Sequence, residues 1–179
     1  MSMGSHKRTG YGQKGAPLLF SFSMSAFIVT GFFGLASGRR IRTEISKTNG
    51  TAQAIYHISY TTSIDCNISG PVSAELRKYS PPGDTIFQDD TIAYVIAKAY
   101  VPPGNVQGNI LLEAIHIAPV LGDPTSREYE DKVPDFVQPA VFIHGTVSGD
   151  SDNEQNGVVT FPVVVSDYVR GSTMQTTLM

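Results

Sequence analysis

The sequence has a single cysteine and few charged residues. Cys66 stands alone, so no disulfide can form within the chain, and nothing favours an oxidising compartment. Charged residues make up 16% of the chain, well below the share of about a quarter found in soluble domains. Together with 41% hydrophobic residues and frequent glycine and proline, this composition favours an all-β protein with many turns over a helical one.

Catalytic motifs are also absent. The chain contains no G-x-S-x-G, H-E-x-x-H or C-x-x-C pattern, and no glycine-rich loop that opens a helix and could hold a phosphate. His57, His116 and His144 lie in strand-like segments and not in a metal-ligand spacing. We therefore expect no enzyme, no cofactor and no metal site.

The segments that are present alternate with turns at short intervals, as in all-β domains. Apolar patterns predict five strands, over Met24–Phe33, Arg39–Lys47, Ala52–Thr62, Thr91–Val101 and Asn109–Ala118. Asn49-Gly50 predicts a tight hairpin between the second and third of these, because a type I′ turn needs positive φ at both central residues.

The segment SGPVSAELRKYS, residues 69–80, predicts a short helix after the third strand. Pro71 suits its first turn, and Arg77 and Lys78 suit its negative end. The resulting order predicts an all-β, five-stranded OB-like Greek-key barrel with one short helix, plus a C-terminal β-hairpin.

These patterns divide the chain into four segments. Residues 1–21 are expected to be a flexible tail, 22–119 the barrel, and 120–138 an acidic, proline-containing linker with a turn of helix at Ser126–Asp131. Residues 139–179 are expected to form a hairpin around an acidic loop. Since two strands alone are marginal in water, this hairpin packs on the barrel, pairs with another chain, or opens a partial second OB-like unit.

One run, Pro17–Ala36, carries no charge and is long enough to span a bilayer. Serine, threonine and glycine dilute it, and it begins with phenylalanine–serine alternation, so a buried strand is favoured over a membrane anchor or a signal peptide. We expect no membrane partner and an intracellular location, nuclear or cytoplasmic.

Four segments carry a resemblance to known proteins. DDTIAYVIAKAYVPPG, ILLEAIHIAPVLGDP, EYEDKVPDF and FPVVVSDYVR span roughly residues 85–170 and resemble a group of uncharacterised fungal proteins described as OB-fold-like. The layout is more distantly similar to single-stranded-DNA-binding subunits such as those of replication protein A. The resemblance implies an OB-like fold and no particular chemistry.

Charge is divided between the two ends of the sequence. Residues 1–50 carry a net charge of +6 and the remainder −9, which indicates a basic surface at one end. An OB barrel binds single strands with a groove that combines cations and stacking aromatics. The candidate nucleic-acid-binding residues are Arg39, Arg40, Arg42, Lys47, Tyr56, Tyr60, Tyr94, Lys98 and Tyr100.

These residues predict a non-catalytic OB-fold protein that binds single-stranded nucleic acid through a basic β-hairpin and a tyrosine-bearing sheet face. Tyrosines on half-buried strands also pack, and exposed arginines also serve solubility, so the same residues are compatible with a structural role. The alternative is a structural, oligomerising interaction module in which the C-terminal strand edge and the Val163–Val165 run pair with another subunit, as a homo-oligomer and without nucleic acid.

Overall fold

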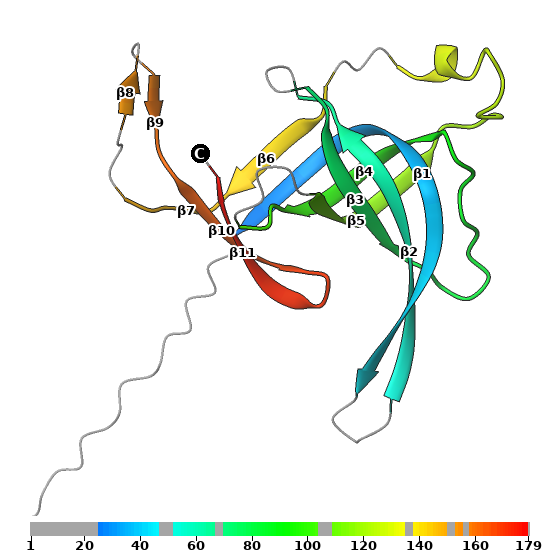
Figure 1. Cartoon of the computed structure of the whole chain (residues 1–179), viewed down its shortest axis with the longest axis horizontal. Helices are drawn as coiled ribbons and strands as arrows, with labels where there is room; N and C mark the ends of the chain where they lie inside the picture. Colours follow the sequence, from blue (N-terminus) through cyan, green and yellow to red (C-terminus); the bar gives the residue numbers. More distant parts are fainter. Residues whose placement is uncertain are drawn as a thin grey trace, which may run out of the picture.

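Five strands form a closed barrel in the computed structural model, which describes residues 25–46, 52–66, 70–103, 109–134, 138–149, 153–155 and 158–178. The strands are β1 (Ala26–Ser46), β2 (Ala52–Ile64), β3 (Val72–Tyr79), β4 (Thr91–Tyr100) and β5 (Ile110–Pro119). They are hydrogen-bonded in the order β2-β3-β5-β4-β1, and the pairing of β1 with β2 closes the ring (Figure 1). Only β3 and β5 run parallel among these pairs. The predicted all-β, OB-like barrel is confirmed.

Strand β1 takes the place of two predicted strands. Its first part pairs with β4 through Leu35, and its later part pairs with β2 from Ala36 onward. The register shifts between Ala36 and Arg39, where Ser37 has a positive φ of 53°. This irregularity bends the strand, as bulges do, so that one strand reaches both of its barrel neighbours without a break.

The predicted helix at residues 69–80 is wrong, because this segment contains β3. Ala74 and Leu76 are fully buried, whereas the alternate residues Glu75 and Arg77 point outward. Alanine, glutamate, leucine, arginine and lysine all favour helices, but here pairing with β2 and β5 and burial at period two decide the structure. The barrel still has five strands, because β3 is one strand more than predicted and two other predicted strands merge into β1.

Residues 80–90, which connect β3 to β4, contain no helix. The ring of Phe87 stacks on Tyr60, with ring centroids 5.8 Å apart and planes tilted by 17°. The side chain of Tyr129 is 2% exposed, and its hydroxyl accepts a hydrogen bond from the backbone N–H of Ile92. It precedes a short 3-10 helix, η1 (Glu130–Lys132), which overlaps the end of the turn of helix predicted at Ser126–Asp131.

The C-terminal part adds strands around the barrel. They are β6 (Ala140–His144), β7 (Thr146–Val147), β8 (Asn153–Gln155), β9 (Val158–Thr160), β10 (Val163–Val169) and β11 (Ser172–Leu178). Strand β6 extends the barrel sheet beside β1, and β7, β10 and β11 form a small sheet. The predicted hairpin is present in the pairs β7–β10 and β8–β9, whereas β11 was not predicted.

The core fills the barrel and includes the C-terminal hairpin. Val165 of β10 belongs to the same buried cluster as Val29, Val95 and Leu112, so the hairpin packs on the barrel, one of the arrangements expected for it. Among the described residues, no helix has the length and apolar character that a bilayer crossing requires. The predicted tail, residues 1–21, and the start of the Pro17–Ala36 run lie outside the described residues.

Candidate nucleic-acid interface

A two-stranded ribbon projects from the barrel. We call it the arm: residues 39–46 of β1 paired with residues 52–59 of β2. Figure 1 shows it extending well beyond the other barrel strands. The predicted turn at Asn49-Gly50 and the candidate Lys47 lie outside the described residues.

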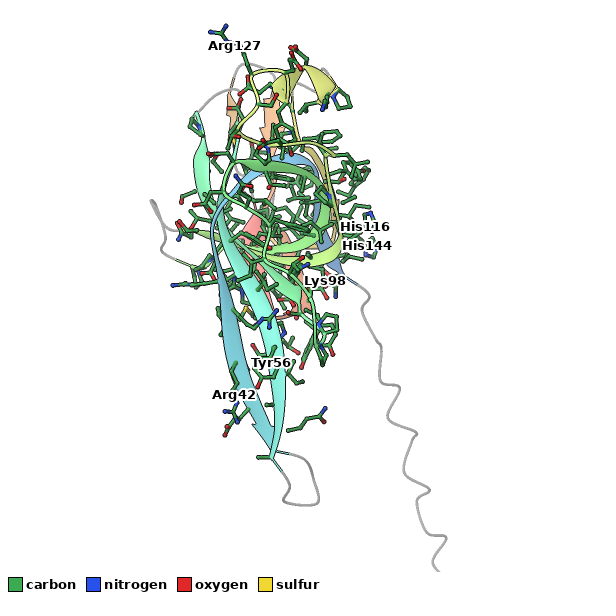
Figure 2. All side chains as sticks on the ribbon, turned by 90° about the vertical axis from the view of Figure 1, so that its right-hand side faces the viewer. Arg42, Tyr56, Lys98, His116, Arg127 and His144 are labelled. Carbon is green, nitrogen blue, oxygen red and sulfur yellow. The ribbon has the colours of Figure 1, made fainter. Side chains whose placement is uncertain are left out.

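One face of the arm combines exposed cations with an exposed phenol. Arg42 lies directly opposite Tyr56 in the strand register, so the two side chains share a face, together with Arg40 and Glu44. Tyr56 is 39% exposed, and Figure 2 shows both labelled side chains on the projecting part of the arm. We call this set the arm face.

The arm face has internal contacts of its own. The Arg42 guanidinium forms an ion pair with the Glu44 carboxylate at 2.8 Å, and both side chains are more than half exposed. An ion pair in that setting is weak, which leaves Arg42 available to another anion. The Arg40 guanidinium donates a hydrogen bond to the backbone carbonyl of Asp84, in the segment between β3 and β4.

Arg39 lies on the opposite face of the arm. It is paired with Ser59 in the register, and alternate residues of a strand point to opposite sides. Its charge contributes to lowering the pKa of the Glu75 carboxyl on β3. The structure therefore does not bring Arg39 together with Arg40 and Arg42.

Tyr60 cannot act as a stacking surface, and the prediction that it does so is wrong. Its side chain is 1% exposed, and its hydroxyl accepts a hydrogen bond from the Phe87 backbone N–H at 3.0 Å. Burial raises the pKa of its phenol. Because β2 enters the barrel between Tyr56 and Tyr60, the inner of the two rings becomes part of the core.

Tyr94, Lys98 and Tyr100 lie on the outer face of β4, between β1 and β5, and are not brought beside the arm face. The Tyr94 hydroxyl accepts a hydrogen bond from Thr30 at 2.8 Å, and its ring packs against Phe32. Lys98 forms an ion pair with Asp167 of β10 at 2.7 Å, and Figure 2 shows it on the barrel, away from Arg42 and Tyr56.

The outer face of β2, β3 and β5 carries a polar network that the sequence analysis missed. Arg77 pairs with Glu113 at 2.8 Å, and Arg170, in the β10–β11 turn, pairs with Glu75 at 3.1 Å. All four side chains are at most 24% exposed. Recognising them required β3 to be predicted as a strand, since only period two places Glu75 and Arg77 on one face.

The electrostatics of this network follow from its packing. Burial by itself would raise the pKa of Glu75, but hydrogen bonds from Ser59 and Arg170 and the nearby positive charges outweigh it, so this pKa lies below its ordinary value. Burial, followed by the charge of Arg77, lowers the pKa of His57. The rings of His57 and Tyr79 also make a T-shaped contact, and Tyr79 is 60% exposed.

The Val163–Val165 run, one of the two segments predicted for oligomerisation, is not a free edge. Val163 pairs with Leu178 on one side and Val147 on the other, and Val164 is likewise paired on both sides. Val165 is 3% exposed. Strand β11, which was not predicted, occupies one edge of β10, so the part of the predicted contact that used Val163–Val165 is wrong. Within the described residues β11 lies at the edge of the small sheet, so the contact predicted for the C-terminal strand edge stays a prediction.

No group of three or more His, Cys, Asp or Glu side chains that could hold a metal ion occurs among the described residues. Neither a protein-family model nor a curated protein sequence matches the chain. The fold is similar to the crystal structure of a deletion mutant of the single-stranded DNA-binding protein from Thermus aquaticus, with a TM-score of 0.42 and 14% sequence identity. The alignment covers 86% of this chain and 74% of that chain.

Proposed function

We propose that this protein binds single-stranded nucleic acid, without catalysis, on the arm face. The observation that carries the proposal is the exposed pair of Arg42 and Tyr56, which face each other across two strands that project from an OB-like barrel. The strand 2–3 surface and the loop between strands 1 and 2 are where OB folds bind oligonucleotides. The arm is the extension of that loop.

The mechanism follows from the chemistry of the two side chains. Arginine on the arm attracts the phosphate backbone, and a base of an unpaired strand stacks on the Tyr56 ring. A stacked base contributes about 1–3 kcal/mol in such sites. Glu44 weakens the positive potential without removing it, since Arg40 and Arg42 outnumber it. An intracellular location, nuclear or cytoplasmic, is part of this proposal.

The first prediction tests the arginines. Replacing Arg40→Ala and Arg42→Ala together removes two cations from the arm face, so we expect affinity for a labelled oligo-dT to fall at low salt. The plot of log affinity against log salt concentration should also become flatter, by about 0.7 for each lost phosphate contact. Fluorescence anisotropy at several salt concentrations measures both quantities.

The matched control is Arg127→Ala, which removes an exposed cation that Figure 2 shows at the end of the molecule opposite Arg42. It should leave the affinity and its salt dependence close to those of the unchanged protein. Equal binding by the unchanged protein and the double variant would show that the arm face is not the binding site.

A second candidate function, self-association, is favoured by strand β6. Its five residues are all exposed, including Val141, Phe142 and Ile143 at 51%, 60% and 47%. Within the described residues, β6 pairs with β1 alone. Edge strands usually carry charges or proline that prevent pairing with other chains, and AVFIH has neither. A second copy of β6, antiparallel across a two-fold axis, would meet no like charge.

A further inference from the structure

The barrel wall opens between β3 and β5. The two strands pair only over Ala74–Arg77 and Ile110–Glu113. Beyond this point β3 ends at Tyr79, and β5 has a register shift against β4 between Ile96 and Ala97. A cavity of about 300 Å³ occupies the opening, lined by Lys78, Tyr79, Pro81 and Asp84 on one side and by residues 114–117 of β5 on the other. We call it the β3–β5 pocket.

The entrance of the pocket is apolar and partly aromatic. Tyr79 is 60% exposed and Ile115 58% exposed, on opposite sides of the opening. The Tyr79 ring is held by an edge contact with His57, whose ring centroid lies 6.3 Å away at 80°. Because Tyr79 is 60% exposed, part of its ring remains open to solvent beside the opening.

The inner part of the pocket is charged. Lys78 forms an ion pair with the Asp84 carboxylate, with distances of 3.0 and 3.2 Å to its two oxygens. The ammonium group also lies 4.6 Å from the centre of the Phe87 ring. These side chains are only 11% and 21% exposed. The opening between β3 and β5 makes an inward-facing donor and acceptor reachable from outside.

The pocket adjoins the base of the arm. Tyr79 pairs with His57, and the backbone N–H of Ser80 donates to the carbonyl of Tyr56 at 2.9 Å. The backbones of Tyr56 and Ser80 are therefore one strand spacing apart, about 5 Å, with Lys78 on the same face of the sheet as Tyr56 and Tyr79 on the opposite face. The pocket meets the arm face at Asp84, whose backbone carbonyl accepts a hydrogen bond from Arg40, while its lining residues lie on β3, β5 and the segment after β3.

We propose that the β3–β5 pocket binds a single base of the bound strand and selects guanine; this inference rests on the proposed function. The Asp84 carboxylate accepts from both the N1–H and the exocyclic amino group of guanine, and the Lys78 ammonium donates to its O6. Carboxylates accept two hydrogen bonds side by side, and an ammonium only donates. Tyr79 stacks on the ring.

The other bases do not match this pair. Guanine presents an N1–H donor to the carboxylate. Adenine and cytosine present a ring nitrogen without a proton at that position, so two acceptors would face each other with no hydrogen between them. Uracil and thymine present one N–H and no adjacent amino group. A site whose buried polar groups are left unpaired by the wrong ligand discriminates strongly against it.

The test uses the ¹⁵N-labelled full chain and free 5′-monophosphates of guanosine, adenosine, cytidine and uridine, followed by amide chemical shifts. We expect guanosine monophosphate to shift the amides of Tyr79, Asp84 and His116 and to bind about tenfold more tightly than the other three. Asp84→Asn should reduce its affinity to the level of the others, and Tyr79→Ala should weaken all four nucleotides.

Two variants serve as controls. Asp131→Asn removes an exposed carboxylate at η1, and Tyr168→Ala removes a tyrosine that is 61% exposed on β10. Both should leave the guanosine preference intact. If the four nucleotides bind equally to the unchanged protein, or none shifts the pocket amides, the inference is overturned whether or not the variants fold.

Oligonucleotides separate this inference from the proposed function. Oligo-dT with one central guanine should bind about tenfold more tightly than oligo-dT alone. Arg42→Ala, which leaves the contact between Arg40 and Asp84 in place, should weaken both equally. If neither oligonucleotide binds but guanosine monophosphate still occupies the pocket, the proposed function fails and the pocket stands. If both bind equally, the pocket assignment fails and the proposed function stands.

Discussion

Two tyrosines on β2 illustrate what decides the role of a single residue. Tyr56 and Tyr60 point to the same face of the strand, as their spacing predicts, yet one is 39% exposed and the other 1%. The strand leaves the barrel between them, and nothing in the local pattern marks that position. Periodicity therefore predicts which residues share a face, but not which of them lie over a core. The sequence pattern could identify the candidate tyrosines but could not distinguish the exposed Tyr56 from the buried Tyr60.

A glycine at the bend of β1 provides a prediction at this scale. A Cβ atom at Gly38 would lie 2.8 Å from the Tyr60 ring and also against Ile86. Because the Tyr60 ring is held in the core, we expect Gly38→Ala to lower the free energy of unfolding by about 1–3 kcal/mol, the usual cost of overpacking. Urea denaturation followed by circular dichroism measures this change.

Gly34→Ala is the matched control on the same strand, since a Cβ there meets no atom within 4 Å. It should leave stability unchanged or slightly raised, because alanine restricts the unfolded chain more than glycine does. If both substitutions had the same effect, close packing at the bend would not be the reason for glycine at position 38.

At the scale of elements, the β10–β11 hairpin is fastened to the barrel by polar contacts. Arg170 and Gly171 form its turn with φ of 55° and 88°, a conformation that arginine rarely adopts. The Arg170 guanidinium donates to the Glu75 carboxylate and to the Glu75 backbone carbonyl, each at 3.1 Å. These bonds offset the strain in the turn and hold the hairpin tip on β3.

The Glu75 carboxyl makes this attachment sensitive to acid. Its pKa in the folded protein lies below the ordinary value of 4.5, so its contribution to stability is present above that value and is lost as the pH falls through the folded pKa. We expect Glu75→Gln to be less stable than the unchanged protein by about 1–3 kcal/mol at pH 7. The difference should shrink as the pH is lowered below 4.5.

Urea denaturation at pH 7, 5, 4 and 3 measures that difference. Glu44→Gln, which disrupts an exposed ion pair on the arm, should change stability little at pH 7. If the difference in free energy of unfolding between Glu75→Gln and the unchanged protein stayed constant down to pH 3, the role assigned to the Glu75 carboxylate would be contradicted.

Sequence patterns suffice to predict some of these strands but not others. The hairpin signal and the apolar runs of β4 and β5 predict strands that the structure contains, because each pattern agrees with its surroundings. The segment SAELRKY has high helix propensity, and only its place between β2 and β5 makes it a strand. The β3–β5 pocket depends on that placement, so it could not be predicted from the sequence.

For the whole molecule, the exposed β6 edge predicts association between copies. We expect the unchanged protein to form a dimer at high concentration and Phe142→Lys to be monomeric, because a charge on an edge strand opposes pairing. Size-exclusion chromatography with light scattering over a range of concentrations measures the mass. The control Leu121→Lys changes a residue that is 84% exposed on a loop and should dimerise normally.

A single mass, that of the monomer, at every concentration would rule out this second candidate function. A dimer formed equally by the unchanged protein and Phe142→Lys would place the contact elsewhere. Because the measurement needs no oligonucleotide, its result does not depend on whether the arm face binds nucleic acid.

The parallel pairing of β3 with β5 has a consequence for how the chain is made. Strands β1, β2 and β3 leave the ribosome in sequence order, but one side of β3 has no partner until residues 110–113 have been synthesised. The ring cannot close before then, and Val165 fills the core only later still. Nascent chains therefore pass through a stage with an open sheet edge, the kind of species that chaperones bind.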